Sequence, residues 1–142
     1  MITFRRATFE DVFELERIRG LVRENQLSST IPRERLLAAL DTRGRGWVAI
    51  DGESIVGFSM ADLPDSSIWA LFLLPEWEGK GLGRSLLDCA VSWLGQKECS
   101  KIWLSTAPGT RAEGFYEHLG WKRTGLTDKG EVRFELQLAP RK

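Results

Sequence analysis

The stretch from residue 68 to residue 87 constrains the fold of this chain more than any other. Residues 68–74 are apolar at every position, which is typical of a strand covered on both faces, and Pro75 ends it because proline has no N–H for the ladder. The apolar spacing over residues 83–97 predicts a helix. The turn between strand and helix contains three glycines at alternate positions, Gly79, Gly81 and Gly83. A buried strand that leads through such a turn into a helix indicates an α/β domain.

This turn is a candidate site for a phosphate or pyrophosphate group. Glycine adopts positive φ and lets a ligand approach the backbone, and the first N–H groups of a helix have no partner within it. Those donors favour an anion, and Lys80 and Arg84 add cationic side chains. A glycine-rich connection without a ligand is the alternative. The P-loop pattern is excluded because no Gly-Lys is followed by Ser or Thr. The dinucleotide fingerprint is excluded because it needs glycine at its sixth position, and counting from Gly79 that position is Arg84.

Residues 78–83, with the sequence Glu-Gly-Lys-Gly-Leu-Gly, resemble motif A of the GNAT superfamily of N-acetyltransferases, Arg/Gln-x-x-Gly-x-Gly/Ala. Residues 115–121 are similar to the FYxxxGF segment of the same family. Motif A holds the pyrophosphate of acetyl-CoA in that family, so the resemblance implies acetyl-CoA as co-substrate. The cofactor-binding residues that it implies are the strand backbone at Leu71, Phe72 and Leu73 and the turn residues Gly79, Lys80, Gly81, Leu82, Gly83 and Arg84.

Two positions depart from the family pattern. Glu78 stands where the family usually has Arg or Gln, and we expect its carboxylate to weaken CoA binding without abolishing it, provided that it points to water. Gly109 stands where many relatives carry an asparagine that contacts the cofactor. Thr110 or Arg111 is a candidate replacement for that contact, and a solvated Arg111 is the alternative.

The chemistry that the resemblance implies is direct transfer of an acetyl group from a thioester to an amine. A backbone N–H at Phe72 or Leu73 is the candidate to face the carbonyl oxygen, which gains charge in the transition state. Tyr116, the only tyrosine of the chain, stands where the family places the proton donor for the leaving thiolate. A core aromatic ring with a hydroxyl at the surface is the alternative for Tyr116.

The sequence does not identify the group that removes a proton from the amine. Residues 68–74 contain no acid, and the predicted strand 101–106 offers only Ser105 and Thr106. The alternatives are a chain of waters or a carboxylate that acts through water, with Asp62, Asp65 and Glu24 as candidates.

The acceptor pocket is expected beside the first two helices, which form one of its walls in the family. Residues 25–31 lie between these helices and are the candidate region for substrate choice. Trp69 and Trp103 lie on the two strands that flank the proposed gap. We interpret both as core residues, and a role in lining the acceptor pocket is the alternative.

The whole chain is predicted to form a single domain over residues 1–142. The resemblance implies an α/β (α+β) GNAT fold, with a mixed sheet of about seven mostly antiparallel strands, a splayed parallel pair and about four flanking helices. The predicted strands are 2–6, 46–50, 54–61, 68–74, 101–106, 121–125 and 131–138. The first helix is predicted to follow a capping pair at Thr8 and Asp11, and the others to cover 33–40, 83–97 and 110–119.

Charge and composition argue against several partners. The chain has 20 basic and 20 acidic residues, which gives no net field to attract nucleic acid or an anionic membrane. No apolar run is long enough to cross a bilayer, and no signal peptide is recognised. Cys89 and Cys99 suit reduced thiols, so we expect a cytoplasmic protein, and a single histidine predicts no metal site. The expected partners are acetyl-CoA and an amine acceptor, and the sequence leaves a homodimer open.

Three functions are consistent with these patterns. The first is an N-acetyltransferase that acts on the amine of a small molecule or a protein. The second is a non-catalytic module that binds or senses an acyl-CoA, which the unidentified base and Gly109 suggest. The third is a toxin that acetylates aminoacyl-tRNA, a use that some relatives make of the fold and that the balanced charge disfavours.

Overall fold

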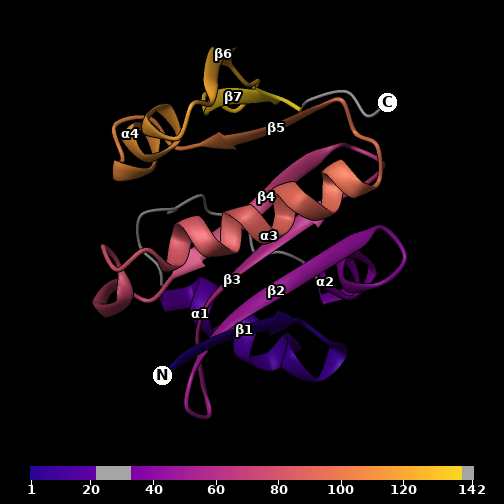
Figure 1. Cartoon of the computed structure of the whole chain (residues 1–142), viewed down its shortest axis with the longest axis vertical. Helices are drawn as coiled ribbons and strands as arrows, with labels where there is room; N and C mark the ends of the chain where they lie inside the picture. The colour runs from indigo at the N-terminus through magenta and orange to yellow at the C-terminus, as the bar shows by residue number, and fades with distance from the viewer. Residues whose placement is uncertain (22–32, 139–142) are drawn as a thin grey trace.

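A single sheet organises the part of the molecule that the computed structural model describes, residues 1–21 and 33–138. Its seven strands are β1 (Ile2–Arg6), β2 (Gly44–Asp51), β3 (Ser54–Asp62), β4 (Ser67–Leu73), β5 (Lys101–Thr106), β6 (Lys122–Leu126) and β7 (Val132–Gln137). The α-helices are α1 (Val12–Leu21), α2 (Arg33–Leu40), α3 (Leu82–Gln96) and α4 (Arg111–His118), and two short 3-10 turns are η1 (Phe9–Asp11) and η2 (Pro75–Trp77). The strands lie in the order β1-β2-β3-β4-β5-β7-β6 (Figure 1).

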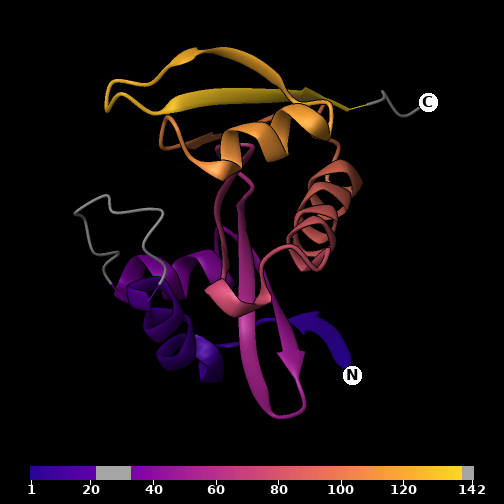
Figure 2. The same cartoon turned by 90° about the vertical axis from the view of Figure 1, so that its left-hand side faces the viewer.

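The sheet is antiparallel except at one place, because β4 and β5 run parallel. Helices α1 and α2 lie on one side of the sheet and α3 lies on the other (Figure 2). This arrangement confirms the predicted mixed sheet with a parallel pair and flanking helices. Several predicted boundaries are wrong by one residue, and β2 differs most, because it begins at Gly44, which pairs with Asp62, two residues before the predicted start. The first helix begins with the 3-10 turn η1. The turn η2 was not predicted, because Pro75 marks only the end of the strand.

The strands β4 and β5 meet at one register point and then separate. Ser67 lies opposite Trp103, and the backbone N–H of Trp103 donates to the Ser66 carbonyl at 3.0 Å. Beyond this point β4 continues along β3 and β5 continues along β7. One edge of β4 is therefore left without a neighbouring strand toward its C-terminal end, which confirms the predicted splay.

Buried cores on both sides of the sheet fix the two separating strands. On the α1 and α2 side, Phe58 and Phe72 pack with their ring centroids 5.3 Å apart. On the α3 side, Leu86 is fully buried and its carbonyl accepts a hydrogen bond from the Ser59 hydroxyl at 2.9 Å. Because α3 is anchored along its length, the glycine turn at its start is held in place.

The predicted capping pair at the first helix is confirmed. The Thr8 N–H donates to the Asp11 carboxylate at 2.8 Å, and the Arg5 guanidinium donates to both of its oxygens at 2.8 and 2.9 Å. The predictions for Glu24 and for residues 25–31 lie outside the described residues. None of the described helices is long and apolar enough to cross a membrane.

Candidate functional site

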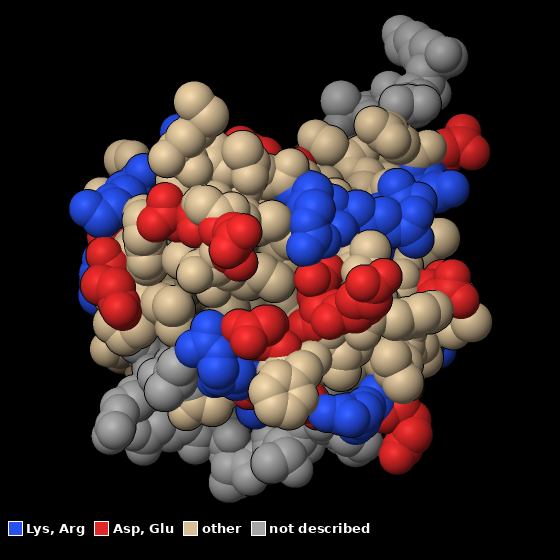
Figure 3. Space-filling view, turned by 90° about the horizontal axis from the view of Figure 1, so that it is seen from below, with Lys and Arg blue, Asp and Glu red and all other residues tan. Residues whose placement is uncertain are grey.

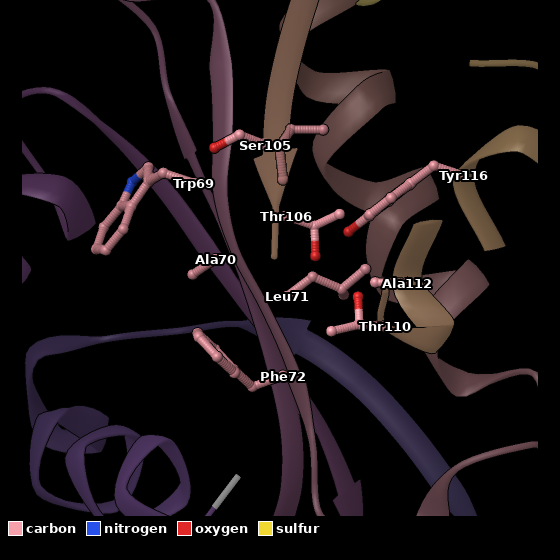
Figure 4. A pocket seen from close by; sticks show the side chains of 10 residues that line it. Trp69, Ala70, Leu71, Phe72, Ser105, Thr106, Thr110, Ala112 and Tyr116 are labelled. Carbon is pink, nitrogen blue, oxygen red and sulfur yellow. The ribbon is translucent and has the colours of Figure 1, made fainter. Parts of the chain in front are cut away.

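A cavity of about 230 Å³ lies where β4 and β5 separate. It is lined by Leu71 and Leu73 of β4, by Glu78, Gly79, Gly81, Gly83 and Arg84 at the glycine turn and the start of α3, and by Arg111, Ala112, Phe115 and Tyr116 of α4. A narrower cavity of about 60 Å³ lies between β4 and the end of β5, and Leu71, Ala112 and Tyr116 line both (Figure 4). The sequence stretches predicted to bind the cofactor and to supply the proton donor therefore meet at one site.

The glycine turn leaves open space over its backbone. Gly79 and Gly81 have φ of 76° and 84°, and a Cβ added to either would meet no atom within 4 Å. Gly81 is the N-cap of α3, and no side chain caps this helix by a hydrogen bond. The first N–H groups of α3 are therefore available to an anion, which is the arrangement that a phosphate group needs.

Not every predicted cofactor-binding residue lines the larger cavity. Phe72 lines the narrower one. Lys80 is exposed and lines neither cavity, and the Leu82 side chain is buried in a core with Leu86. For Phe72, Lys80 and Leu82, contact with a cofactor stays a prediction.

Glu78 does not simply point to water. Its carboxylate accepts a hydrogen bond from the Arg111 guanidinium at 2.7 Å, which joins the glycine turn to the first residue of α4. The Arg111 side chain is 68% exposed and the Glu78 side chain 24%. The arginine thus balances the carboxylate that departs from the family pattern, and both residues line the larger cavity.

Tyr116 combines a buried ring with a hydroxyl that points into the gap between the strands (Figure 4). The residue is 6% exposed, and its ring packs against Trp121 and Phe134 with centroids 5.9 and 5.7 Å away. Burial raises the pKa of the hydroxyl above its ordinary value, so the group stays protonated at neutral pH. A neutral hydroxyl held in this way is suited to donate a proton.

The carboxylates predicted as bases have other partners or lie elsewhere. Asp62 accepts hydrogen bonds from Arg43 at 3.1 and 3.2 Å and from the Asp65 N–H at 3.1 Å, and Asp65 lies in the turn between β3 and β4. Both lie near the Ser67 end of β4, where the two strands are still paired. Glu24 lies outside the described residues.

The structure adds one acid that sequence reasoning missed. Glu131 accepts a hydrogen bond from the Ser105 hydroxyl at 2.9 Å, and Ser105 lines the narrower cavity. The two residues are 26 positions apart, and they meet because Thr106 pairs with Val132. No local pattern signals this contact, since it depends on the register of β5 against β7.

Four other residues proposed to lie around the gap are Gly109, Thr110, Trp69 and Trp103. Gly109 has a φ of 75°, and its N–H donates to the Glu113 carboxylate at 3.1 Å. The Thr110 hydroxyl donates to the Ala107 carbonyl at 2.8 Å, and Thr110 lines the narrower cavity. Trp69 also lines that cavity, whereas Trp103 does not. Within the described residues, no group of three His, Cys, Asp or Glu side chains is placed to hold a metal ion.

Comparison with known proteins gives consistent matches. The model of the acetyltransferase (GNAT) family matches residues 9–121. A peptidyl-lysine N-acetyltransferase, YjaB, from Salmonella typhimurium strain LT2 is 31% identical over 96 residues, which are 61% of this chain and 56% of that protein. A [ribosomal protein bS18]-alanine N-acetyltransferase from Haemophilus influenzae is 25% identical over 79 residues, 54% of each chain. The matches thus span about half the length of these curated relatives.

A solved structure shares the fold over nearly the whole chain. The PaiA N-acetyltransferase from Thermoplasma acidophilum, solved in complex with coenzyme A, superposes with a TM-score of 0.80 at 21% identity. The match covers 97% of this chain and 99% of that one.

Proposed function

The chain belongs to the acetyltransferase (GNAT) family, and from that premise we propose that it transfers the acetyl group of acetyl-CoA directly to an amine. The observation that carries this proposal is that the Tyr116 hydroxyl and the open glycine turn face connected parts of one gap. A phosphate site and a buried proton donor on the same gap match the two ends of a thioester substrate, its diphosphate and its sulfur.

We expect the diphosphate to bind the N-terminus of α3. The open space at Gly79 and Gly81 and the uncapped first turn fit such a group, and Arg84 and Arg111 supply cationic side chains beside it. The free edge of β4 at Leu71, Phe72 and Leu73 would then bind the arm of the substrate through backbone groups. A backbone N–H at Phe72 or Leu73 is our candidate to stabilise the charge that develops on the carbonyl oxygen.

Tyr116 is our candidate for the acid that protonates the departing sulfur. Its raised pKa keeps the proton on the hydroxyl until a thiolate forms beside it. The position of the hydroxyl in the gap supports this role over the alternative of a core aromatic with its hydroxyl at the surface (Figure 4).

The acceptor is an amine of a protein or of a small molecule. The two curated relatives are N-acetyltransferases for a peptidyl lysine and for the alanine of a ribosomal protein, so peptide amines are the first acceptors to test. An aminoacyl-tRNA acceptor is less well supported, because acidic and basic side chains are interspersed on the face seen in Figure 3. We place the reaction in the cytoplasm, in keeping with the free cysteines Cys89 and Cys99.

Release of CoA thiol from acetyl-CoA tests the proposal. The acceptors are a peptide that begins with alanine, an N-terminally blocked peptide with one lysine, and 2-phenylethylamine. We expect thiol release with at least one of them, and mass spectrometry should find the acetylated amine. Tight CoA binding without release from any acceptor would instead favour the acyl-CoA sensor.

A further inference from the structure

A hydrogen-bonded pair of side chains, Ser105 and Glu131, lies beside the gap on the side away from Tyr116. The Ser105 hydroxyl donates to Glu131 Oε1 at 2.9 Å. The Glu131 backbone is fixed as well, because its N–H donates to the Thr127 hydroxyl at 3.1 Å and its carbonyl accepts from the Thr127 N–H at 2.8 Å. The carboxylate therefore lies beside the end of β5, on an anchored backbone and hydrogen-bonded to Ser105.

The alternation of β5 separates this pair from the proposed acid. Ile102, Leu104 and Thr106 are buried on one face of the strand, so Ser105 projects from the opposite face. Figure 4 shows the Ser105 hydroxyl on the same side of β5 as Trp69, while the Tyr116 hydroxyl enters the gap from α4. Both Ser105 and Tyr116 line the narrower cavity, so a reacting group placed there would lie between them.

The charges around Glu131 leave its carboxylate without a cation. Arg133 and Lys101 both pair with Glu135, at 3.2 and 3.6 Å, and the Arg133 guanidinium lies 4.2 Å from the ring centre of Trp103. Among the described residues, no Lys or Arg is within ion-pair distance of Glu131. The other charged side chains on the neighbouring strand β6 and in the turn between β6 and β7 are Lys122, Arg123, Asp128 and Lys129, and Arg123 pairs with Glu113 at 3.4 Å.

From this geometry we propose that Ser105 accepts a proton from the acceptor ammonium and passes its own proton to Glu131, an inference that rests on the proposed function above. One N–H bond of the ammonium breaks as a new O–H bond forms on Ser105, while the original Ser105 proton forms an O–H bond on Glu131. The amine keeps its electron pair and attacks the acetyl carbon. Tyr116 protonates the sulfur and regains a proton from the nitrogen, and Glu131 releases its proton to water.

This inference explains why the strands themselves carry no acid. Only Ser105 touches the acceptor, whereas Glu131 acts through it from the residue before β7. The hydroxyl extends the reach of a carboxylate that is not itself on either of the separating strands. The proposed base and the proposed acid then act on different atoms, the acceptor nitrogen and the departing sulfur.

The test compares Glu131→Gln and Ser105→Ala with the wild type, using acetyl-CoA and the three acceptors named above. Glu53→Gln is the matched control, because Glu53 is exposed in the turn between β2 and β3. We expect Glu131→Gln and Ser105→Ala to lower kcat/KM for the acceptor about 100-fold near neutral pH. The loss should shrink toward about pH 10, where the acceptor amine loses its proton without help. The dissociation constant of CoA and the kinetics of Glu53→Gln should match the wild type.

Three results would overturn the inference. The first is an active wild type with unchanged kinetics in both variants, which removes the proton relay and leaves the proposed function intact. The second is an equal loss at every pH, which assigns the pair a structural role. The third is a wild type that binds CoA and acetylates none of the three acceptors, which removes the proposed function together with the relay. Should Glu131→Gln not fold, Ser105→Ala alone decides, since it removes only one oxygen.

Discussion

Replacing Tyr116 with phenylalanine separates the catalytic role of its hydroxyl from the structural role of its ring. The ring of Tyr116 is retained with its neighbours Phe115, Trp121 and Phe134, and none of the described residues forms a hydrogen bond with the hydroxyl. The free energy of unfolding at pH 7 should therefore change by less than about 1 kcal/mol. By contrast, kcat should fall by about 100-fold or more, with little change in KM for acetyl-CoA.

The same variant predicts a difference in stability at high pH. Burial raises the pKa of Tyr116 in the folded state above the value near 10 of an unfolded tyrosine. Above about pH 10 the unfolded state therefore loses this proton first, and the wild type should lose up to about 1.4 kcal/mol of stability per pH unit until the folded pKa is reached. Tyr116→Phe lacks this contribution, so its stability should fall less steeply than that of the wild type.

The assay is urea unfolding at several pH values around and above about pH 10, compared between wild type and variant. Since the chain has one tyrosine, tyrosinate absorption reports on Tyr116 alone and shows directly whether the folded protein keeps the proton. Identical alkaline slopes in the two proteins, or a variant with the full kcat, would refute the reasoning from burial.

The remaining predictions concern the glycine turn and the first helix. Glu78→Gln releases Arg111 from its ion pair, so CoA affinity measured by calorimetry should rise about two- to five-fold; a fall would contradict this. Gly81→Val should destabilise the fold by about 1–2 kcal/mol and weaken CoA binding because φ is 84°, whereas Gly114→Ala in α4, the control, should cost nothing. Asp11→Asn should cost about 1–3 kcal/mol near neutral pH. Because hydrogen bonds from Arg5 lower the pKa of Asp11, that difference from wild type should vanish as pH falls through the lowered value; urea unfolding at acid pH checks this.

The sequence pattern was sufficient to predict those elements whose formation depends on residues close together in the chain. The apolar run 68–74 and the glycines after it predicted β4, the turn and α3, because strand burial, positive φ and helix spacing depend on neighbouring residues. The place of Tyr116 beside the gap followed from a motif resemblance. The sequence alone could not show whether its hydroxyl points into the gap or lies at the surface.

The contacts that sequence reasoning missed depend on elements far apart in the chain. Glu131 meets Ser105 only because β7 pairs with β5 in one register, and a shift by one residue would turn the side chain to the other face. Glu78 and Arg111 are 33 positions apart and meet across the larger cavity. Spacing along the chain cannot predict such pairs until the arrangement of the strands is known.

The single register point between β4 and β5 has a consequence for a bound substrate. A molecule that fills the gap could form hydrogen bonds with the backbone where β4 and β5 form none with each other. It would thereby connect the group of strands β1, β2, β3 and β4 with the group β5, β7 and β6. Its binding would then raise the free energy of unfolding, by about 2.7 kcal/mol at a concentration 100 times the dissociation constant. The bound thioester would thus occupy the free edge of β4 as an additional strand would, and the protein without substrate would leave that edge unpaired.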